Sequence, residues 1–128
     1  WYQRRVRGML SFIIAFQEVV DMTNNFQEEI GKQKYAFVKF FSPGCPACVR
    51  IKETFAELEN NNFVQKNKIA LIEVNCQDGF TLCQNEGIKG YPNLRLYKNG
   101  KFIDKYRNVN IIEAWQDWLE EQLQKSDL

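Results

Sequence analysis

Two cysteines separated by two residues stand where an apolar run meets a helical pattern, and this junction constrains the fold more than any other part of the chain. The run from 35 to 41 is apolar except for Lys39, which predicts a strand covered on both faces. After Cys45 and Cys48, apolar residues recur at helical spacing, at Ile51, Phe55 and Leu58. The segment therefore predicts a strand, a sharp turn and a helix that meet at the two cysteines.

This spacing at the start of a helix suits reversible disulfide chemistry. Two intervening residues bring the sulfurs into bonding range without displacing the backbone. Cys45 lies where the helix N-terminus carries partial positive charge, which favours the thiolate over the thiol. Because the thiolate is the form that attacks a disulfide, the pattern predicts a redox-active pair.

Two other interpretations of the pair stay open. Such a pair is also half of a zinc site, for which Cys76 and Cys83 are the available partners. Their spacing is longer than the roughly two to four residues usual between zinc ligands, and the chain has no histidine to assist. The second interpretation is that the two cysteines are incidental.

Length, composition and net charge restrict the class of protein. A chain of 128 residues with 45% apolar and 26% charged residues is long enough to bury the core of one globular domain. A net charge of +1 gives no indication of a nucleic-acid partner or an acidic substrate. The lack of histidine excludes imidazole catalysis and histidine-ligated metals, and we expect no cofactor beyond the cysteines. Four cysteines in two local pairs favour disulfides and an oxidising compartment.

The beginning of the chain differs in pattern from the rest, and we divide the sequence into 1–16 and a domain over 17–128. Residues 9–16 form an apolar run, too short to span a bilayer, that follows three arginines, Arg4, Arg5 and Arg7. This order is typical of a secretory signal, with Met9 as an alternative start. An ordered arm that packs on the domain is the competing interpretation. We expect no membrane span within this chain.

Apolar runs and helical patterns alternate along the domain. Besides the strand over 35–41, the patterns predict strands over 17–22, 69–75, 93–98 and 101–106. They also predict a helix capped by Thr23 that ends near Gly31, the helix after the cysteines to about Asn60, a helix over 79–86 and an amphipathic helix from Ile112. Asn99-Gly100 is a strong signal for a two-residue hairpin. The order βαβαβαββα predicts an α/β fold with a mixed sheet and helices on both faces.

With this order of elements, the sequence resembles a thioredoxin-fold domain of the protein disulfide isomerase family. The resemblance extends over about 17–124. It rests on Phe40 to Cys48, Val74-Asn75-Cys76, Cys83, Gly87 to Pro92, Lys98-Asn99-Gly100 and Tyr106-Arg107. It implies a thioredoxin fold in which a central mixed sheet is flanked by helices.

The resemblance also implies roles for individual residues. Cys45 is expected to attack a substrate disulfide and Cys48 to resolve the mixed disulfide. A cis bond before Pro92 is expected, with the backbone at Gly90 and Tyr91 presented to an extended peptide. Cys76 and Cys83 are expected to form a structural disulfide, with a second redox-active pair as the alternative.

Three departures from the family pattern affect the chemistry. Gly44 stands in place of a tryptophan, and Pro46-Ala47 stand in place of Gly-His. Without that histidine we expect a less acidic Cys45 and a weaker oxidant than a typical isomerase domain. The position of a mobile family arginine is occupied by Asn110, with Arg107 nearby, and the kinking proline of the active-site helix is replaced by Glu53.

The most informative departure concerns a buried charge pair. The family has a glutamate on the strand before the motif and a lysine on the adjacent strand, whereas this chain has Lys39 and Glu73 with the signs exchanged. We expect the two to pair beneath the cysteines, because an unpaired buried charge is unfavourable by several kcal/mol. Glu73 is then the candidate for proton exchange with Cys48. The alternative is that one or both side chains reach the surface and take no part in catalysis.

These observations predict a thiol–disulfide oxidoreductase or isomerase that acts on cysteine-containing proteins or peptides. The expected location is the endoplasmic reticulum lumen or the secretory pathway, and the end from Lys125 to Leu128 weakly resembles a retrieval signal. We expect a monomeric domain, on its own or within a multidomain protein. A redox-inert, chaperone-like peptide-binding module is the main alternative, and a cytosolic thioredoxin-like reductase is a third.

Overall fold

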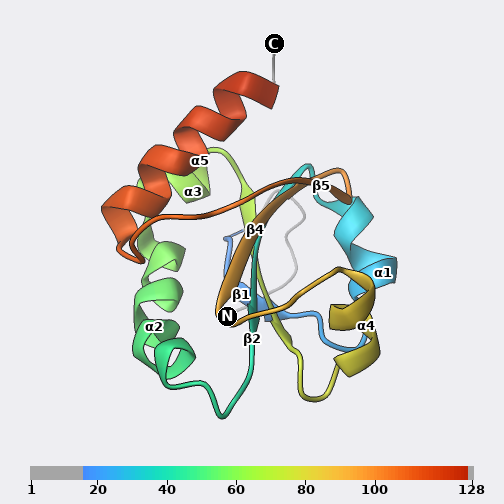
Figure 1. The fold of residues 1–128 in the computed structure, drawn as a ribbon. Coiled ribbons are helices and arrows are strands. Elements are labelled where there is room, and N and C mark those ends of the chain that lie inside the picture. The colour runs from blue at the N-terminus through green and yellow to red at the C-terminus, as the bar shows by residue number, and fades with distance from the viewer. Residues whose placement is uncertain (1–15, 127–128) are drawn as a thin grey trace.

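The computed structural model describes residues 16–126, so the predictions on residues 1–15 and on the last two residues lie outside it. Five strands form one mixed sheet in the order β1-β3-β2-β4-β5 (Figure 1). The strands are β1 (Val19–Asp21), β2 (Tyr35–Phe41), β3 (Ile69–Asn75), β4 (Asn93–Lys98) and β5 (Lys101–Lys105). β1, β3 and β2 are parallel, and β4 and β5 run antiparallel to their neighbours. The predicted mixed sheet is confirmed.

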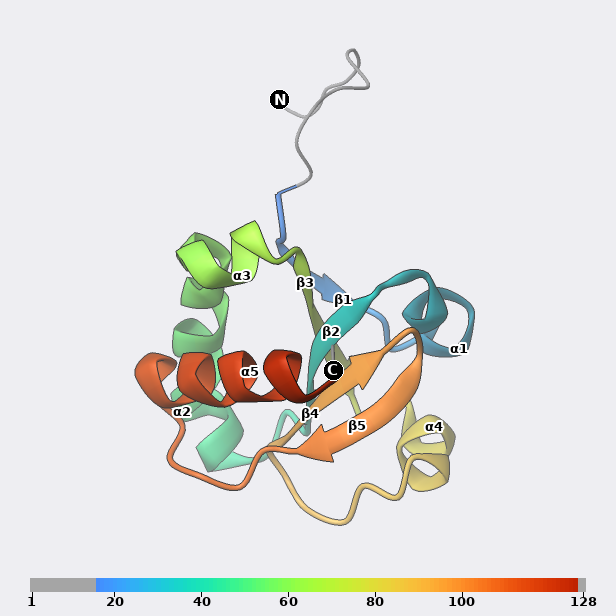
Figure 2. The ribbon, with the colours of Figure 1, turned by 90° about the horizontal axis from the view of Figure 1, so that it is seen from above.

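Helices cover both faces of this sheet, as predicted. They are α1 (Phe26–Glu29), α2 (Pro46–Ala56), α3 (Asn62–Lys66), α4 (Phe80–Asn85) and α5 (Ile112–Ser126), with short 3-10 turns at Ile30–Lys32 and Glu57–Asn60. α2, α3 and α5 lie on one face, and α1 and α4 lie on the other (Figures 1 and 2). Among the described residues, no helix is both long and apolar enough to cross a membrane.

The two faces of β2 supply two separate cores. Phe37 packs beneath α2 and α5, with its ring centroid 5.7 Å from that of Phe55 and 6.1 Å from that of Trp115. Phe40 points to the opposite face, where its ring centroid is 5.9 Å from that of Phe26. Because side chains alternate along a strand, Lys39 shares the face of Phe37 and is directed toward α2. A buried charge therefore lies below the helix that carries the cysteines.

The prediction that Thr23 caps the first helix is wrong. α1 begins at Phe26 after Asn25, whose side chain makes no capping bond. Thr23 is engaged elsewhere, because its hydroxyl donates to Asp21 Oδ1 at 2.6 Å and accepts from the Asn75 N–H at 2.9 Å. Thr23 thus ties the end of β1 to the end of β3, and β1 is shorter than the predicted 17–22.

The helix predicted to reach about Asn60 ends at Ala56 and continues as a 3-10 turn over Glu57–Asn60, and a short helix that was not predicted follows at once. Asn61 starts α3, because its Oδ1 accepts from the Val64 N–H at 3.0 Å. The asparagine run therefore ends one helix and caps the next. The last strand ends at Lys105, one residue before the predicted limit.

The β4–β5 hairpin turns through Asn99 and Gly100, as predicted, with φ values of 52° and 84°. A Cβ at Gly100 would lie 2.9 Å from the Gly31 Cα, whereas a Cβ at Gly87, whose φ is 75°, would meet nothing within 4 Å. Alanine in the left-handed region is unfavourable by about 1–2 kcal/mol at either site. We expect Gly100→Ala to lower the free energy of unfolding by a further 1–3 kcal/mol or so, relative to Gly87→Ala, because of the overlap. Equal losses in urea unfolding would contradict this contact.

Candidate active site

The two cysteines occupy the start of α2. Cys45 is the N-cap residue, and Pro46 fills the first helical position, where a missing N–H leaves no bond unmade. The Cys45 N–H donates to the Ser42 carbonyl oxygen at 3.1 Å, which closes the turn after β2. The Cys48 N–H donates to Cys45 Sγ at 3.1 Å. The Cys45 sulfur thus accepts a hydrogen bond at the N-terminal end of α2.

The two sulfurs differ in access. Both thiols are free, with Cys45 half-buried and Cys48 only 4% exposed. A Cβ placed on Gly44 would meet nothing within 4 Å, so the backbone does not require glycine there. Glycine instead leaves the approach to Cys45 open, where the family has a bulky tryptophan. A large substrate can therefore reach the first sulfur and not the second.

Burial raises the pKa of the Cys48 thiol to about 11. Loss of solvent is the largest cause, and the hydrogen bond to Cys45 raises the pKa further, whereas a backbone contact with Ser42 and the charge of Lys39 lower it. The raised pKa favours the protonated thiol of Cys48 at neutral pH.

We expect alkylation of Cys48 in a Cys45→Ser variant to accelerate about tenfold for each pH unit from 7 to 9. The serine removes the contribution of Cys45 to the pKa, but desolvation still holds the pKa above its ordinary value. Iodoacetamide labelling, followed by mass spectrometry, measures the rate. A plateau reached below pH 8 would contradict a buried, protonated Cys48.

Lys39 and Glu73 are partners across neighbouring strands. They occupy the same register position of β2 and β3, and Lys39 Nζ lies 3.6 Å from Glu73 Oε2. The Lys39 side chain is 3% exposed and the Glu73 side chain 28%, so the lysine is the buried member. Nζ also lies 4.9 Å from the ring centroid of Phe55, on α2. Burial lowers the pKa of Lys39, and the negative charge of Glu73 opposes that shift.

A cavity of about 270 Å³ joins this pair to the second cysteine. Its lining includes Cys48, Lys39 and Glu73, together with Lys52 from α2 and Ser42 from the turn. The cavity is large enough for water, although its lining is more apolar than polar. The exchanged charges therefore line the same cavity as Cys48.

The Tyr91–Pro92 bond is cis, and Pro92 directly precedes β4. Asn93, the first residue of β4, pairs with Phe40, one residue before the end of β2. Pro92 therefore lies beside the end of β2, from which the cysteine turn departs. Tyr91, the residue before the proline, is 41% exposed.

Cys76 and Cys83 form a disulfide with an S–S distance of 2.07 Å. Both are buried, and the bond ties the end of β3 to α4. Since neither sulfur is a free thiolate, neither is available to the zinc site considered above. Within residues 16–126, no group of three or more acidic side chains, cysteines or histidines is arranged to hold a metal ion.

The two candidates for the mobile arginine position are engaged elsewhere. Arg107 Nη1 donates to Asp104 Oδ1 and to the Lys105 carbonyl oxygen, both at 2.9 Å. Asn110 Oδ1 accepts from Trp115 Nε1 at 3.2 Å. Neither residue lines the cavity beside Cys48.

One residue near the site, Arg95 on β4, was not identified from the sequence. Its guanidinium bonds to the loop that leads to Pro92, through the carbonyl oxygens of Glu86 and Gly87. These partners are eight or nine residues away in the chain, so no periodic pattern links them. A charged residue between Leu94 and Leu96 was the one available signal.

Together, the mixed sheet, the cysteine pair at a helix start and the neighbouring cis-proline define a thioredoxin-like dithiol domain. The family model of thioredoxin matches residues 17–121. The chain belongs to the thioredoxin family. Its curated relatives across most of the chain are members of the protein disulfide isomerase family.

Among these relatives, a probable protein disulfide-isomerase ER-60 of Schistosoma mansoni is 31% identical over 82% of this chain and 24% of its own length. A putative protein disulfide-isomerase of Schizosaccharomyces pombe is 31% identical over 88% of this chain and 23% of its own length. The chain thus spans about a quarter of these relatives. Among solved structures, human ERp44 in a zinc-bound form superposes with a TM-score of 0.74 at 23% identity, over 81% of this chain and 31% of that one. This last likeness shows the fold alone.

Proposed function

We propose that the chain catalyses thiol–disulfide exchange on protein substrates. The observation that carries the proposal is the arrangement of Cys45 and Cys48, with an accessible sulfur that accepts a helix N–H at 3.1 Å and a second, buried sulfur one helical turn on. An incidental pair gives no reason for this division between a half-buried attacking cysteine and a buried resolving cysteine.

The reaction proceeds in two exchanges. Cys45 thiolate attacks one sulfur of a substrate disulfide, forms a mixed disulfide and releases the other substrate sulfur as thiolate. Cys48 then loses its proton and attacks Cys45 Sγ, which forms the Cys45–Cys48 disulfide and releases the second substrate thiolate. The substrate gains two electrons and the cysteine pair loses two. The reverse sequence oxidises a substrate dithiol, so the direction depends on the relative reduction potentials.

Glu73 and Lys39 support the second exchange. Glu73 is the proton acceptor for Cys48, through the cavity that both residues line. Lys39 holds the Glu73 carboxylate in place, and its positive charge favours the thiolate of Cys48. The carboxylate proposed as proton acceptor thus lies on β3, whereas the family has its glutamate on the strand before the cysteine motif, which is β2 here.

Gly90, Tyr91 and Pro92 supply the peptide site. An extended segment of substrate pairs with the backbone at the exposed Tyr91, beside the cysteine turn. Val49, which is 64% exposed on α2, adds an apolar contact near the motif. Cys76 and Cys83 act structurally, because their buried disulfide is closed to a substrate sulfur.

Reduction of insulin by dithiothreitol tests the proposal. The native chain is expected to accelerate precipitation of the insulin B chain, and Cys45→Ala is expected to be inactive. If both proteins are equally inactive but bind unfolded peptides, the redox-inert peptide-binding module becomes the better account. The kinship with protein disulfide isomerases supports a location in the endoplasmic reticulum or the secretory pathway, where such substrates occur.

A further inference from the structure

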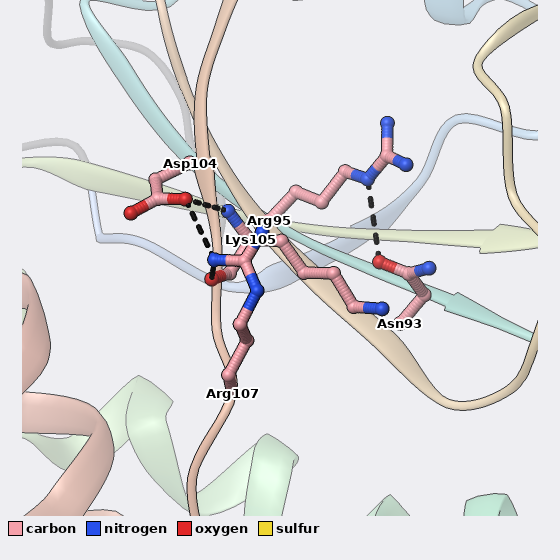
Figure 3. Close-up of polar contacts among 5 residues, drawn as sticks. All are labelled: Asn93, Arg95, Asp104, Lys105 and Arg107. Carbon is pink, nitrogen blue, oxygen red and sulfur yellow. Dashed lines mark hydrogen bonds and ion pairs between the residues drawn. The ribbon is translucent and has the colours of Figure 1, made fainter.

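Arg95 on β4 holds both ends of the segment that carries Tyr91 and Pro92. Its Nη1 donates to the Glu86 carbonyl oxygen at 2.7 Å, and its Nη2 donates to the Gly87 carbonyl oxygen at 3.5 Å. Its Nε donates to Asn93 Oδ1 at 3.3 Å, a contact that Figure 3 shows. One guanidinium therefore connects the end of α4 to the residue that follows the proline.

The far end of this connection is buried. Asn93 is 3% exposed and is the first residue of β4, immediately after Pro92. A buried amide without a partner is unfavourable, so the bond from Arg95 fixes the orientation of the Asn93 side chain. The position of Pro92 is thus linked to the guanidinium through its nearest neighbour in the chain.

Aromatic rings hold the guanidinium itself. Its central carbon lies 4.7 Å from the ring centroid of Phe102 on β5 and 5.8 Å from that of Phe40 on β2. A second anchor acts on the same loop end, because the Tyr97 hydroxyl donates to Glu86 Oε1 at 2.6 Å. These contacts therefore hold the Arg95 guanidinium in one position, so that it does not behave as a mobile surface charge.

The loop between these ends has one anchor of its own near its start, where Ile88 is buried and its N–H donates to the Cys83 carbonyl oxygen at 2.9 Å. The stretch from 86 to 92 contains no helix or strand, and it begins with Gly87 in the left-handed region. Glycine adds conformational freedom at that point. The Arg95 contacts replace the missing regular structure, because a planar guanidinium donates in several fixed directions at once.

We propose that Arg95 is a positioning residue that holds the backbone at Tyr91 and Pro92 ready for docking of an extended peptide. This role rests on the proposed function, in which that backbone is the peptide site. Arg95 touches neither sulfur in this arrangement. Its loss should therefore weaken peptide binding and leave the cysteine equilibrium unchanged.

The test compares the native chain with Arg95→Met and Arg95→Lys. Methionine keeps the apolar stem and removes every donor, and lysine keeps the charge but lacks the planar fork. Arg107→Met is the matched control, because Arg107 also bonds to a side chain and a carbonyl but binds only β5 residues, as Figure 3 shows. Two quantities are measured: the affinity for an S-methylated unfolded peptide, and the Cys45–Cys48 equilibrium with glutathione.

We expect about tenfold weaker peptide binding for Arg95→Met, with native affinity for Arg107→Met and an unchanged glutathione equilibrium for both. Amide hydrogen exchange over 87–91 should accelerate in Arg95→Met.

If that variant does not fold, Arg95→Lys is the comparison, with weaker binding again expected. Native affinity in the folded Arg95 variants, or no peptide binding by the native chain, overturns the inference. If the native chain binds peptide but forms no Cys45–Cys48 disulfide, the proposed redox function fails, while the affinity comparison still decides the role of Arg95.

Discussion

Replacing Cys48 by serine is expected to convert the chain from a turnover catalyst into a trap for its substrates. The first exchange needs only Cys45, whose Sγ is half-buried and open to solvent past Gly44. The second exchange needs a thiol within reach of that sulfur, and serine cannot supply one. We expect turnover to fall by about a thousandfold or more, the order of loss seen when an essential reacting group is removed.

The trapped product is directly visible. A mixed disulfide between Cys48→Ser and a reduced-and-reoxidised substrate protein should appear on non-reducing gels and disappear with dithiothreitol. Cys45→Ser is the matched control, because it keeps the buried sulfur and loses the accessible one. If Cys45→Ser formed the adduct and Cys48→Ser did not, the assignment of attacking and resolving sulfurs would be reversed.

Replacing Glu73 by glutamine is expected to slow the second exchange by about 100-fold, the lower part of the range for a positioned proton acceptor. Glutamine keeps the size of the side chain but accepts no proton at neutral pH. The loss should concern release of the mixed disulfide and not its formation, because Cys45 does not depend on this carboxylate. Rapid-quench measurement of both steps separates the two.

Stability is the necessary companion measurement. Glutamine leaves the Lys39 ammonium without its counter-ion, which is expected to lower the free energy of unfolding by about 1–3 kcal/mol. Lys39→Met tests the other member, and we expect a smaller loss of stability than in Glu73→Gln, because the carboxylate that it leaves unpaired is 28% exposed and retains contact with water. Glu57→Gln, an exposed carboxylate after α2, is the control with native rates. Native release kinetics in Glu73→Gln would remove Glu73 from the mechanism.

The order of elements along the chain and the mixed sheet followed from local patterns because the decisive signals were local. Near-continuous apolar runs marked β2 and β3, and Asn99-Gly100 marked the hairpin. The errors arose where one side chain had two possible partners. Thr23 was predicted to cap a helix, but its hydroxyl donates to Asp21, two residues earlier in the chain. The polar run after the second helix predicted only an end of that helix. Asn61 also caps the next helix, and a single polar run does not distinguish the two roles.

The residues of the site also divide into those that local patterns predict and those that they do not. Cys45 and Cys48 were evident from spacing, and the paired signs of Lys39 and Glu73 from two interruptions in apolar strands. Register then placed them opposite each other, with 3.6 Å between Nζ and Oε2. Arg95 was not foreseen, because its partners lie in a loop whose path no periodicity describes. Contacts made by backbone carbonyls depend on the folded path and not on residue type.

The equilibrium of the native chain with glutathione tests the central claim most directly. Mass spectrometry of alkylated samples, across ratios of reduced to oxidised glutathione, counts the fraction with a Cys45–Cys48 disulfide. The account predicts a single two-electron transition, more reducing than about −180 mV, because no histidine assists the Cys45 thiolate. Glutathione adducts on the separate cysteines without a Cys45–Cys48 disulfide, or a transition at or above that potential, would contradict it.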